Sequence, residues 1–232
     1  MGLSLSVGYL ADVSIGDPDA SRRVSDDFER LNGALIAAGY KPHREPALLD
    51  PSLRFSCDMW GYSGLHHLRR IAAHAAFGLP LPDPVADDAT NDFALKRYYS
   101  EVSRSPGLMS RLFRFRRGSA LGYQHLIVHS DAEGYYVPQD FAEVIFPDDS
   151  LKIPGGMIGS VLRLREECHA MSVLLEIPDG LDPESDDVLN AAEDPASGTA
   201  KWQRYGIESL SCIRLLAACD ASVKAGAAIV FC

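Results

Sequence analysis

The segment 227–232, AAIVFC, is apolar at every position, and this feature constrains the fold most. A short, continuous apolar run bounded by a glycine is typical of a strand that is covered on both faces. It therefore predicts a strand inside a sheet rather than at its edge. Near the other end of the chain, residues 3–10 alternate apolar and small side chains, which predicts a half-buried strand. We expect a sheet that uses segments from both ends of the chain.

Amphipathic helices are expected between these two strands, because apolar residues recur there at spacings of three and four. Ser160 is placed to cap the start of the most regular of them, and Gly226 is placed to end the last. The predicted helices cover residues 26–38, 64–77, 161–176 and 202–225.

The middle of the chain is expected to form a hairpin, with strands over 125–130 and 135–137 joined by a turn that closes at Gly134. The proline-rich stretch 78–92 and the acidic stretch 179–194 are predicted to be surface loops. Strands and helices do not alternate as they do in a doubly wound fold. The expected fold is therefore an α+β single domain over residues 1–232, with helices packed on a mixed or antiparallel sheet.

The charge balance narrows the choice of partner. Thirty-two acidic residues against twenty-two basic ones give a net charge of −10. The summed field repels phosphate backbones and anionic lipid, so neither DNA nor a membrane is an expected partner, whereas a basic protein fits the sign. Five widely spaced cysteines without a Cys-x-x-Cys pair predict reduced thiols. Without a recognisable signal peptide or a bilayer-spanning apolar run, the expected location is the cytoplasm.

The stretch 129–141, HSDAEGYYVPQDF, is the densest group of candidate catalytic side chains. Its candidates are His129, Asp131, Glu133 and Tyr135, which together could supply a general base, an acid and a polar anchor. Turn chemistry explains much of the same stretch, because Asp131 can cap a turn and Gly134 supplies a positive φ. A hairpin followed by a short helix from Phe141 is favoured over a catalytic loop.

A ligand-binding face is the second possibility for this region. His125 and His129 would lie on one face of their predicted strand, with Tyr136 nearby and His66 and His67 contributed by the helix over 64–77. Two imidazoles are too few to define a metal site, which needs three or four ligands. We therefore predict no metal and no cofactor, and treat these residues as candidates for binding.

A basic, aromatic segment runs against the acidic balance. Five arginines lie within fourteen residues, interleaved with Phe113 and Phe115, and Arg114, Arg116 and Arg117 are the centre of this group. Such a patch could bind an acidic partner or RNA. The alternative is a solvated helix face that offsets the acidic loops.

Three segments, 61–68 (GYSGLHHL), 134–144 (GYYVPQDFAEV) and 225–231 (AGAAIVF), occur in an order that resembles the YfbM-like bacterial proteins of unknown function. The resemblance implies a small α+β bacterial protein, and some members of that family are suspected immunity proteins of toxin systems. It supplies no catalytic residues for this chain.

These observations favour a macromolecule-binding protein, of the immunity type or another interaction type. The alternative is a small-molecule enzyme or ligand-binding protein with a pocket at the hairpin formed by residues 125–136. Whether the chain is an enzyme is left open.

Overall fold

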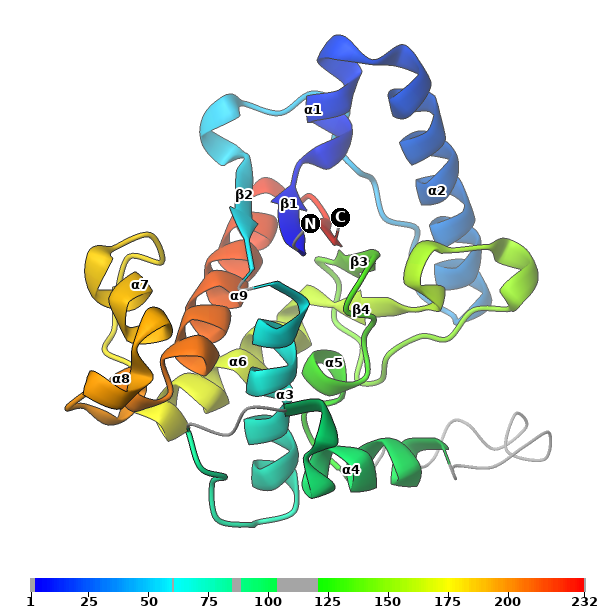
Figure 1. Ribbon diagram of the computed structural model, residues 1–232. Helices are drawn as coiled ribbons and strands as arrows, with labels where there is room; N and C mark the ends of the chain where they lie inside the picture. The colour runs from blue at the N-terminus through cyan, green and yellow to red at the C-terminus, as the bar shows by residue number, and fades with distance from the viewer. Residues whose placement is uncertain (1–2, 60, 85–88, 104–120, 232) are drawn as a thin grey trace.

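The structure is a computed structural model that describes residues 3–59, 61–84, 89–103 and 121–231 (Figure 1). Within these residues a mixed sheet has the order β2-β1-β5-β3-β4. The pairs β1–β2, β1–β5 and β3–β5 are antiparallel, and β3–β4 is parallel. The strands are β1 (Ser4–Val7), β2 (Phe55–Asp58), β3 (Gly134–Val137), β4 (Ile158–Ser160) and β5 (Ile229–Phe231).

The prediction of a buried closing strand is confirmed. β5 lies at the centre of the sheet between β1 and β3, and its three residues are buried. Because alternate side chains of a strand point to opposite faces, Ile229 and Phe231 enter one core while Val230 enters the other. Both faces of the sheet are therefore covered, which is why the segment carries no polar side chain.

Helices cover the two faces of the sheet. Helix α2 packs on the face that bears Val230, whereas α3, α6 and α9 pack on the opposite face (Figure 1). The fold is thus an α+β fold with helices on a mixed sheet. The helices are α1 (Tyr9–Gly16), α2 (Pro18–Ala37), α3 (Gly61–Ala76), α4 (Phe93–Ser103), α5 (Gln124–Ile127), α6 (Val161–Leu175), α7 (Asp186–Glu193), α8 (Lys201–Arg204) and α9 (Gly206–Ala225).

The N-cap residue and the apolar spacing predicted the position of α6 correctly. The Ser160 hydroxyl accepts the backbone N–H of Arg163 at the start of this helix, as an N-cap does. The side chains at spacings of three and four, from Val161 to Leu175, are buried. Helix α2 begins earlier than predicted, because the Asp17 carboxylate accepts the N–H groups of Asp19 and Ala20 and Pro18 occupies the first turn.

The closing helix is broken where the sequence predicted continuity. Residues 201–204 form α8, Tyr205 leaves the helical conformation, and α9 starts at Gly206. A Cβ atom at Gly206 would lie 1.8 Å from the carbonyl oxygen of Ala191, so only glycine lets the start of α9 approach α7 this closely.

The predicted central hairpin is wrong. Residues 124–127 form the short helix α5 instead of a strand, and β3 pairs with β5 and β4 rather than with a preceding strand. Gly134, expected at the turn, begins β3 with φ of 137°. No helix begins at Phe141, because residues 141–148 are irregular. Among the described helices, none combines the length and apolar character needed to cross a membrane.

Candidate functional site

The start of the candidate catalytic stretch and the short helix before it are buried and held by side chains from α3 and α6. The N-terminus of α5 is held by Glu167 of α6, whose carboxylate accepts the N–H groups of His125 and Leu126 at 3.2 and 2.7 Å. Arg69 of α3, which is 2% exposed, donates to the carbonyls of Leu126 and His129. These contacts satisfy backbone groups that would otherwise be buried without partners. Burial raises the pKa of Glu167 to about 7, against the two N–H groups that favour its carboxylate form.

Both histidines of this stretch are buried, and each is 1% exposed. His125 accepts the backbone N–H of Ser160 at Nδ1, and its buried ring also interacts with the backbone of Phe141 and Ala142. His129 has the carbonyls of Ser130 and Tyr135 at 3.1 Å from its two ring nitrogens. Burial lowers the pKa of each imidazole to about 4, so both are neutral near pH 7. A neutral His129 donates to only one of its two carbonyls at a time.

The two candidate tyrosines also make internal contacts. The Tyr136 hydroxyl donates to the carbonyl of His125 at 2.7 Å, and its ring stacks on His129 with centroids 3.9 Å apart. The Tyr135 hydroxyl donates to the carboxylate of Asp27 in α2 at 3.0 Å. Burial raises the pKa of both phenols above the ordinary value, so neither is poised to act as a base.

Structure brings together two candidates that lie far apart in the sequence. His66 Nε2 lies 2.7 Å from the carboxylate of Asp131, and Nη1 of Arg69 lies 3.9 Å from the same carboxylate. The pKa of His66 is lowered by burial and by Arg69, and Asp131 opposes this shift. The remaining ring nitrogen, Nδ1, is buried without a partner in the described residues. One ring nitrogen is therefore occupied by Asp131 and the other is out of reach of a substrate in solution.

The other candidates are separate from this pair. Glu133 is exposed, whereas His67 is buried in α3 with Nδ1 3.6 Å from the carboxylate of Glu208. No group of three or more His, Cys, Asp or Glu side chains within the described ranges is placed to hold a metal ion. Arg114, Arg116 and Arg117 lie outside the described residues.

A dense acidic surface lies elsewhere, on a segment that the sequence predicted to be a loop. Residues 176–200, named here the α7 lobe, contain no Lys, Arg or His. All eight of their carboxylates are exposed. They belong to Glu176, Asp179, Asp182, Glu184, Asp186, Asp187, Glu193 and Asp194.

The lobe is a folded unit and not a free loop. Helix α7 buries Val188, Ala191 and Ala192 against Trp202, Leu210 and Ile213 of α8 and α9. This packing fixes one side of α7 and leaves its carboxylates on the other. In Figure 1 the lobe lies on the far side of α9 from the sheet strands β3 and β4.

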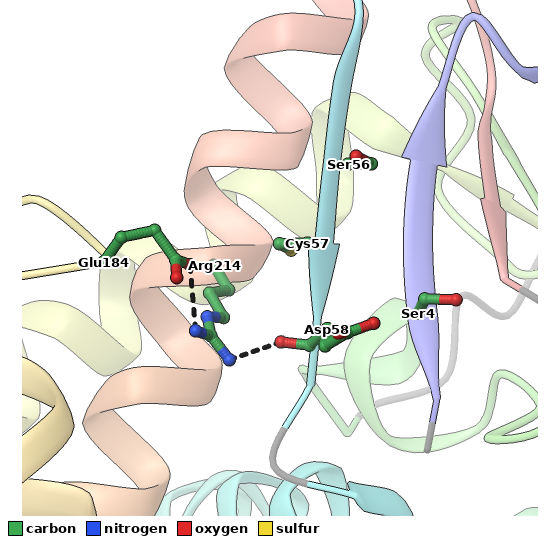
Figure 2. Close-up of a pocket in the computed structure, with 6 residues that line it drawn as sticks. All are labelled: Ser4, Ser56, Cys57, Asp58, Glu184 and Arg214. Carbon is green, nitrogen blue, oxygen red and sulfur yellow. Dashed lines mark hydrogen bonds and ion pairs between the residues drawn. The ribbon is translucent and has the colours of Figure 1, made fainter. Parts of the chain in front are cut away.

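Two of the eight carboxylates have a cation partner among the described residues. Glu176 lies 3.3 Å from Lys201 Nζ, and Glu184 lies 2.8 Å from Nη2 of Arg214 (Figure 2). The other six make no ion pair within the described ranges. The charge of the lobe is therefore mostly uncompensated within the part of the chain that the structure describes.

The carboxylates at the two ends of α7 interact with the helix dipole in opposite ways. Asp186 and Asp187 at the start face the positive end of the helix dipole, which is favourable. Glu193 and Asp194 face the negative end, where the last turn holds no basic residue. Negative charge at that end costs stability, so folding alone does not favour these two residues.

The average density of these charges is close to that of a nucleic-acid strand, although they lie in two pairs separated by about 9 Å of helix axis. Asp186, Asp187, Glu193 and Asp194 span about 12 Å at the helical rise of about 1.5 Å per residue. That is about one charge per 3–4 Å, and one strand of duplex DNA carries one per about 3.4 Å. The lobe thus presents anions at a density that basic side chains normally meet on DNA.

The fold and this surface define an α+β protein with an exposed, largely uncompensated anionic lobe. Residues 1–231 match a family model whose description is "Putative DNA-mimic protein", and the chain belongs to that family. No significant match exists among curated proteins or solved structures. The YfbM-like resemblance stays a prediction, because the family match does not concern those proteins.

Family membership corrects two predictions from the sequence. The immunity-type function is wrong, and so is its alternative of an enzyme or ligand-binding pocket near His125 and Tyr136, because the matching family is described as one of putative DNA-mimic proteins. The prediction for partners, a possible protein with DNA excluded, is also wrong, because it left out the relation to DNA that the family description gives. The net charge of −10 is interpreted from the sequence as repulsion of DNA and as a match for a basic protein, and the same sign is the property that a mimic of DNA needs.

Proposed function

We propose that the protein binds a DNA-binding protein at the surface that otherwise contacts DNA, and presents the α7 lobe in place of phosphate groups. One observation carries the proposal: eight exposed carboxylates lie within residues 176–194, on a lobe without a single basic residue. Family membership supports the same direction.

The physical basis is charge complementarity. DNA-binding proteins contact phosphates mainly through Lys and Arg, and these contacts supply most of their sequence-independent affinity. A folded row of carboxylates can pair with the same Lys and Arg side chains, although it has no base edges for sequence-specific contacts. Such binding is steered by long-range attraction and weakens as salt screens it. We place the complex in the cytoplasm, where the free thiols of Cys57, Cys168, Cys212 and Cys219 stay reduced.

The test is affinity capture from a lysate of the native host on the immobilised full chain, followed by elution with a short duplex oligonucleotide. We expect the captured proteins to bind DNA when purified, and the duplex to displace them. A single-charge control, elution by an equal concentration of glutamate, should displace little. Captured proteins that do not bind DNA, or that the duplex fails to displace, would overturn the proposal.

Matched variants locate the surface. The lobe variant neutralises Asp186, Asp187 and Asp194 to Asn and Glu193 to Gln. The control variant removes the same number of charges from exposed positions outside the lobe: Asp26→Asn, Glu29→Gln, Glu133→Gln and Asp149→Asn. We expect the lobe variant to lose capture and the control variant to retain it. Equal losses would show that net charge, not the lobe, determines binding.

A further inference from the structure

A recess of about 300 Å³ lies beside β2, close to the α7 lobe (Figure 2). β2 is an edge strand, because within the described sheet it pairs with β1 alone. Three residues of this strand line the recess, together with one residue each of β1, the lobe and α9: Ser56, Cys57, Asp58, Ser4, Glu184 and Arg214. Figure 2 shows Arg214 and Glu184 on one side of β2 and β1 on the other.

The hydrogen-bond pattern shows which backbone groups of β2 point away from β1. The N–H of Met59 donates to the carbonyl of Leu3 at 2.8 Å, so these two residues form a hydrogen-bonded pair. Such pairs alternate with pairs that do not bond each other. The N–H and C=O groups of Ser56 and Asp58 therefore point to the free edge, and the bond from Arg214 to the Asp58 carbonyl agrees with this direction.

Arg214 is an unusual neighbour for a free strand edge. Its side chain is 8% exposed, and it donates to Asp58 and to Glu184. Its Nε atom is buried and has no partner among the described residues. A buried guanidinium with an unused donor costs free energy, and that cost favours a further acceptor at this place.

The electrostatics of the recess select the occupant. The carboxylate of Glu184 offsets the charge of Arg214, so the carboxylate of Asp58 and the lobe beyond it leave the surroundings negative. An extended peptide brings alternating C=O and N–H groups to a free edge, and basic side chains on it would match the negative rim.

We propose that the edge of β2 pairs with an extended, basic segment of the partner, which adds to the sheet as an outer strand beside Arg214. The segment's basic side chains then lie near Asp58 and Glu184 while the partner's DNA-contacting surface meets the α7 lobe. The identity of the partner rests on the proposed function. Basic extended arms are common in DNA-binding proteins, whose arms enter a groove while a folded part contacts the backbone.

The test uses a synthetic peptide of alternating lysine and valine, acetylated and amidated, added to the isotopically labelled full chain. We expect at least about tenfold slower hydrogen exchange at the amides of Ser56 and Asp58, because the added strand covers those N–H groups. The control peptide is N-methylated on the edge that would pair, which keeps its charge and removes its donors.

A second pair of variants tests the charge. Asp58→Asn should weaken peptide binding several-fold at low salt, whereas Asp149→Asn, at an exposed site in another part of the chain, should leave it unchanged. Equal protection by the N-methylated peptide, or slowed exchange confined to α7, would overturn the strand pairing. Either result would leave the lobe's function to be decided by the capture and duplex elution, which do not depend on this peptide.

Discussion

Neutralising a carboxylate in α7 should change stability in opposite directions at its two ends. Glu193→Gln removes a negative charge from the negative end of the helix dipole, where the last turn has no basic residue. Asp186→Asn removes one from the positive end. Exposed charges in a terminal turn contribute about 0.3–1 kcal/mol at low ionic strength. We expect a gain of this size for Glu193→Gln, a loss of this size for Asp186→Asn, and weaker partner binding for both.

Urea unfolding followed by circular dichroism at low ionic strength measures these differences. With a slope of about 2 kcal/mol per molar urea, the midpoint should move by about 0.2–0.5 M, upward for Glu193→Gln and downward for Asp186→Asn. In about 1 M salt, where the screening length is about 3 Å, both shifts should shrink. Shifts of the same sign, or shifts that salt does not reduce, would refute the dipole argument. A gain in stability together with a loss of binding would show that Glu193 serves the interaction at the expense of the fold.

Four further predictions concern backbone packing at two glycines, one exposed side chain and a buried histidine. Gly134→Val should lower the free energy of unfolding by at least about 1–2 kcal/mol, since φ is 137° and a Cβ atom would lie 2.8 Å from Cε1 of His129. An unchanged free energy in urea unfolding would contradict this prediction. Glu133→Ala, at an exposed position, should change that free energy by less than about 0.5 kcal/mol in the same assay. Gly206→Ala should speed amide exchange in α7, because the new methyl group overlaps the carbonyl of Ala191; unchanged exchange would show that the two helices can move apart at no cost. His129 should make the protein less stable in acid, because burial lowers its folded pKa to about 4 from the ordinary 6.5. The free energy of unfolding that it contributes is complete above pH 6.5 and is lost as the pH falls toward 4, by up to about 3 kcal/mol, whereas Glu167, with its pKa raised to about 7, gives the opposite trend over this range. The difference in urea midpoints between the native protein and His129→Gln across that range isolates the part due to His129, and an equal pH dependence of the two proteins would contradict it.

Local sequence signals were sufficient for some elements. The Ser160 cap and the regular spacing from Val161 to Leu175 define α6 without help from the rest of the chain. The apolar run of β5 likewise identified a central strand. In both cases the residues that decide the structure lie inside the element or next to it.

The hairpin prediction failed because distant residues decide the conformation of residues 124–127. A short apolar run such as His125-Leu-Ile fits a strand or a helical turn equally well. Glu167 holds the N–H groups at the start of this turn, and Arg69 holds carbonyls at its end. Neither contact can be read from the run itself, and the same is true of the contact between His66 and Asp131.

The α7 lobe was recognisable in part. Its charge was evident in the sequence, but the density of carboxylates obscured the spacing of Val188, Ala191 and Ala192, which form the buried side of a helix. The absence of any basic residue from Ile177 to Ala200 was also evident, but it was interpreted as a property of a solvated loop. A solvated loop has no need for such one-sided charge, whereas a surface that competes for the cations of a partner does.

The central position of β5 determines when the sheet can form. β1 and β3 do not bond each other, and each bonds β5, so Leu5 pairs with Phe231 across almost the whole described sequence. During synthesis β1 is made first and must wait for residues 229–231 before its inner edge is covered. Contacts this distant in sequence slow folding and leave strand edges exposed in the meantime. Nascent chains should therefore depend on chaperones until β5 is made, and the yield of folded protein should be more sensitive to changes in Ile229 or Phe231 than to changes of similar size in α6.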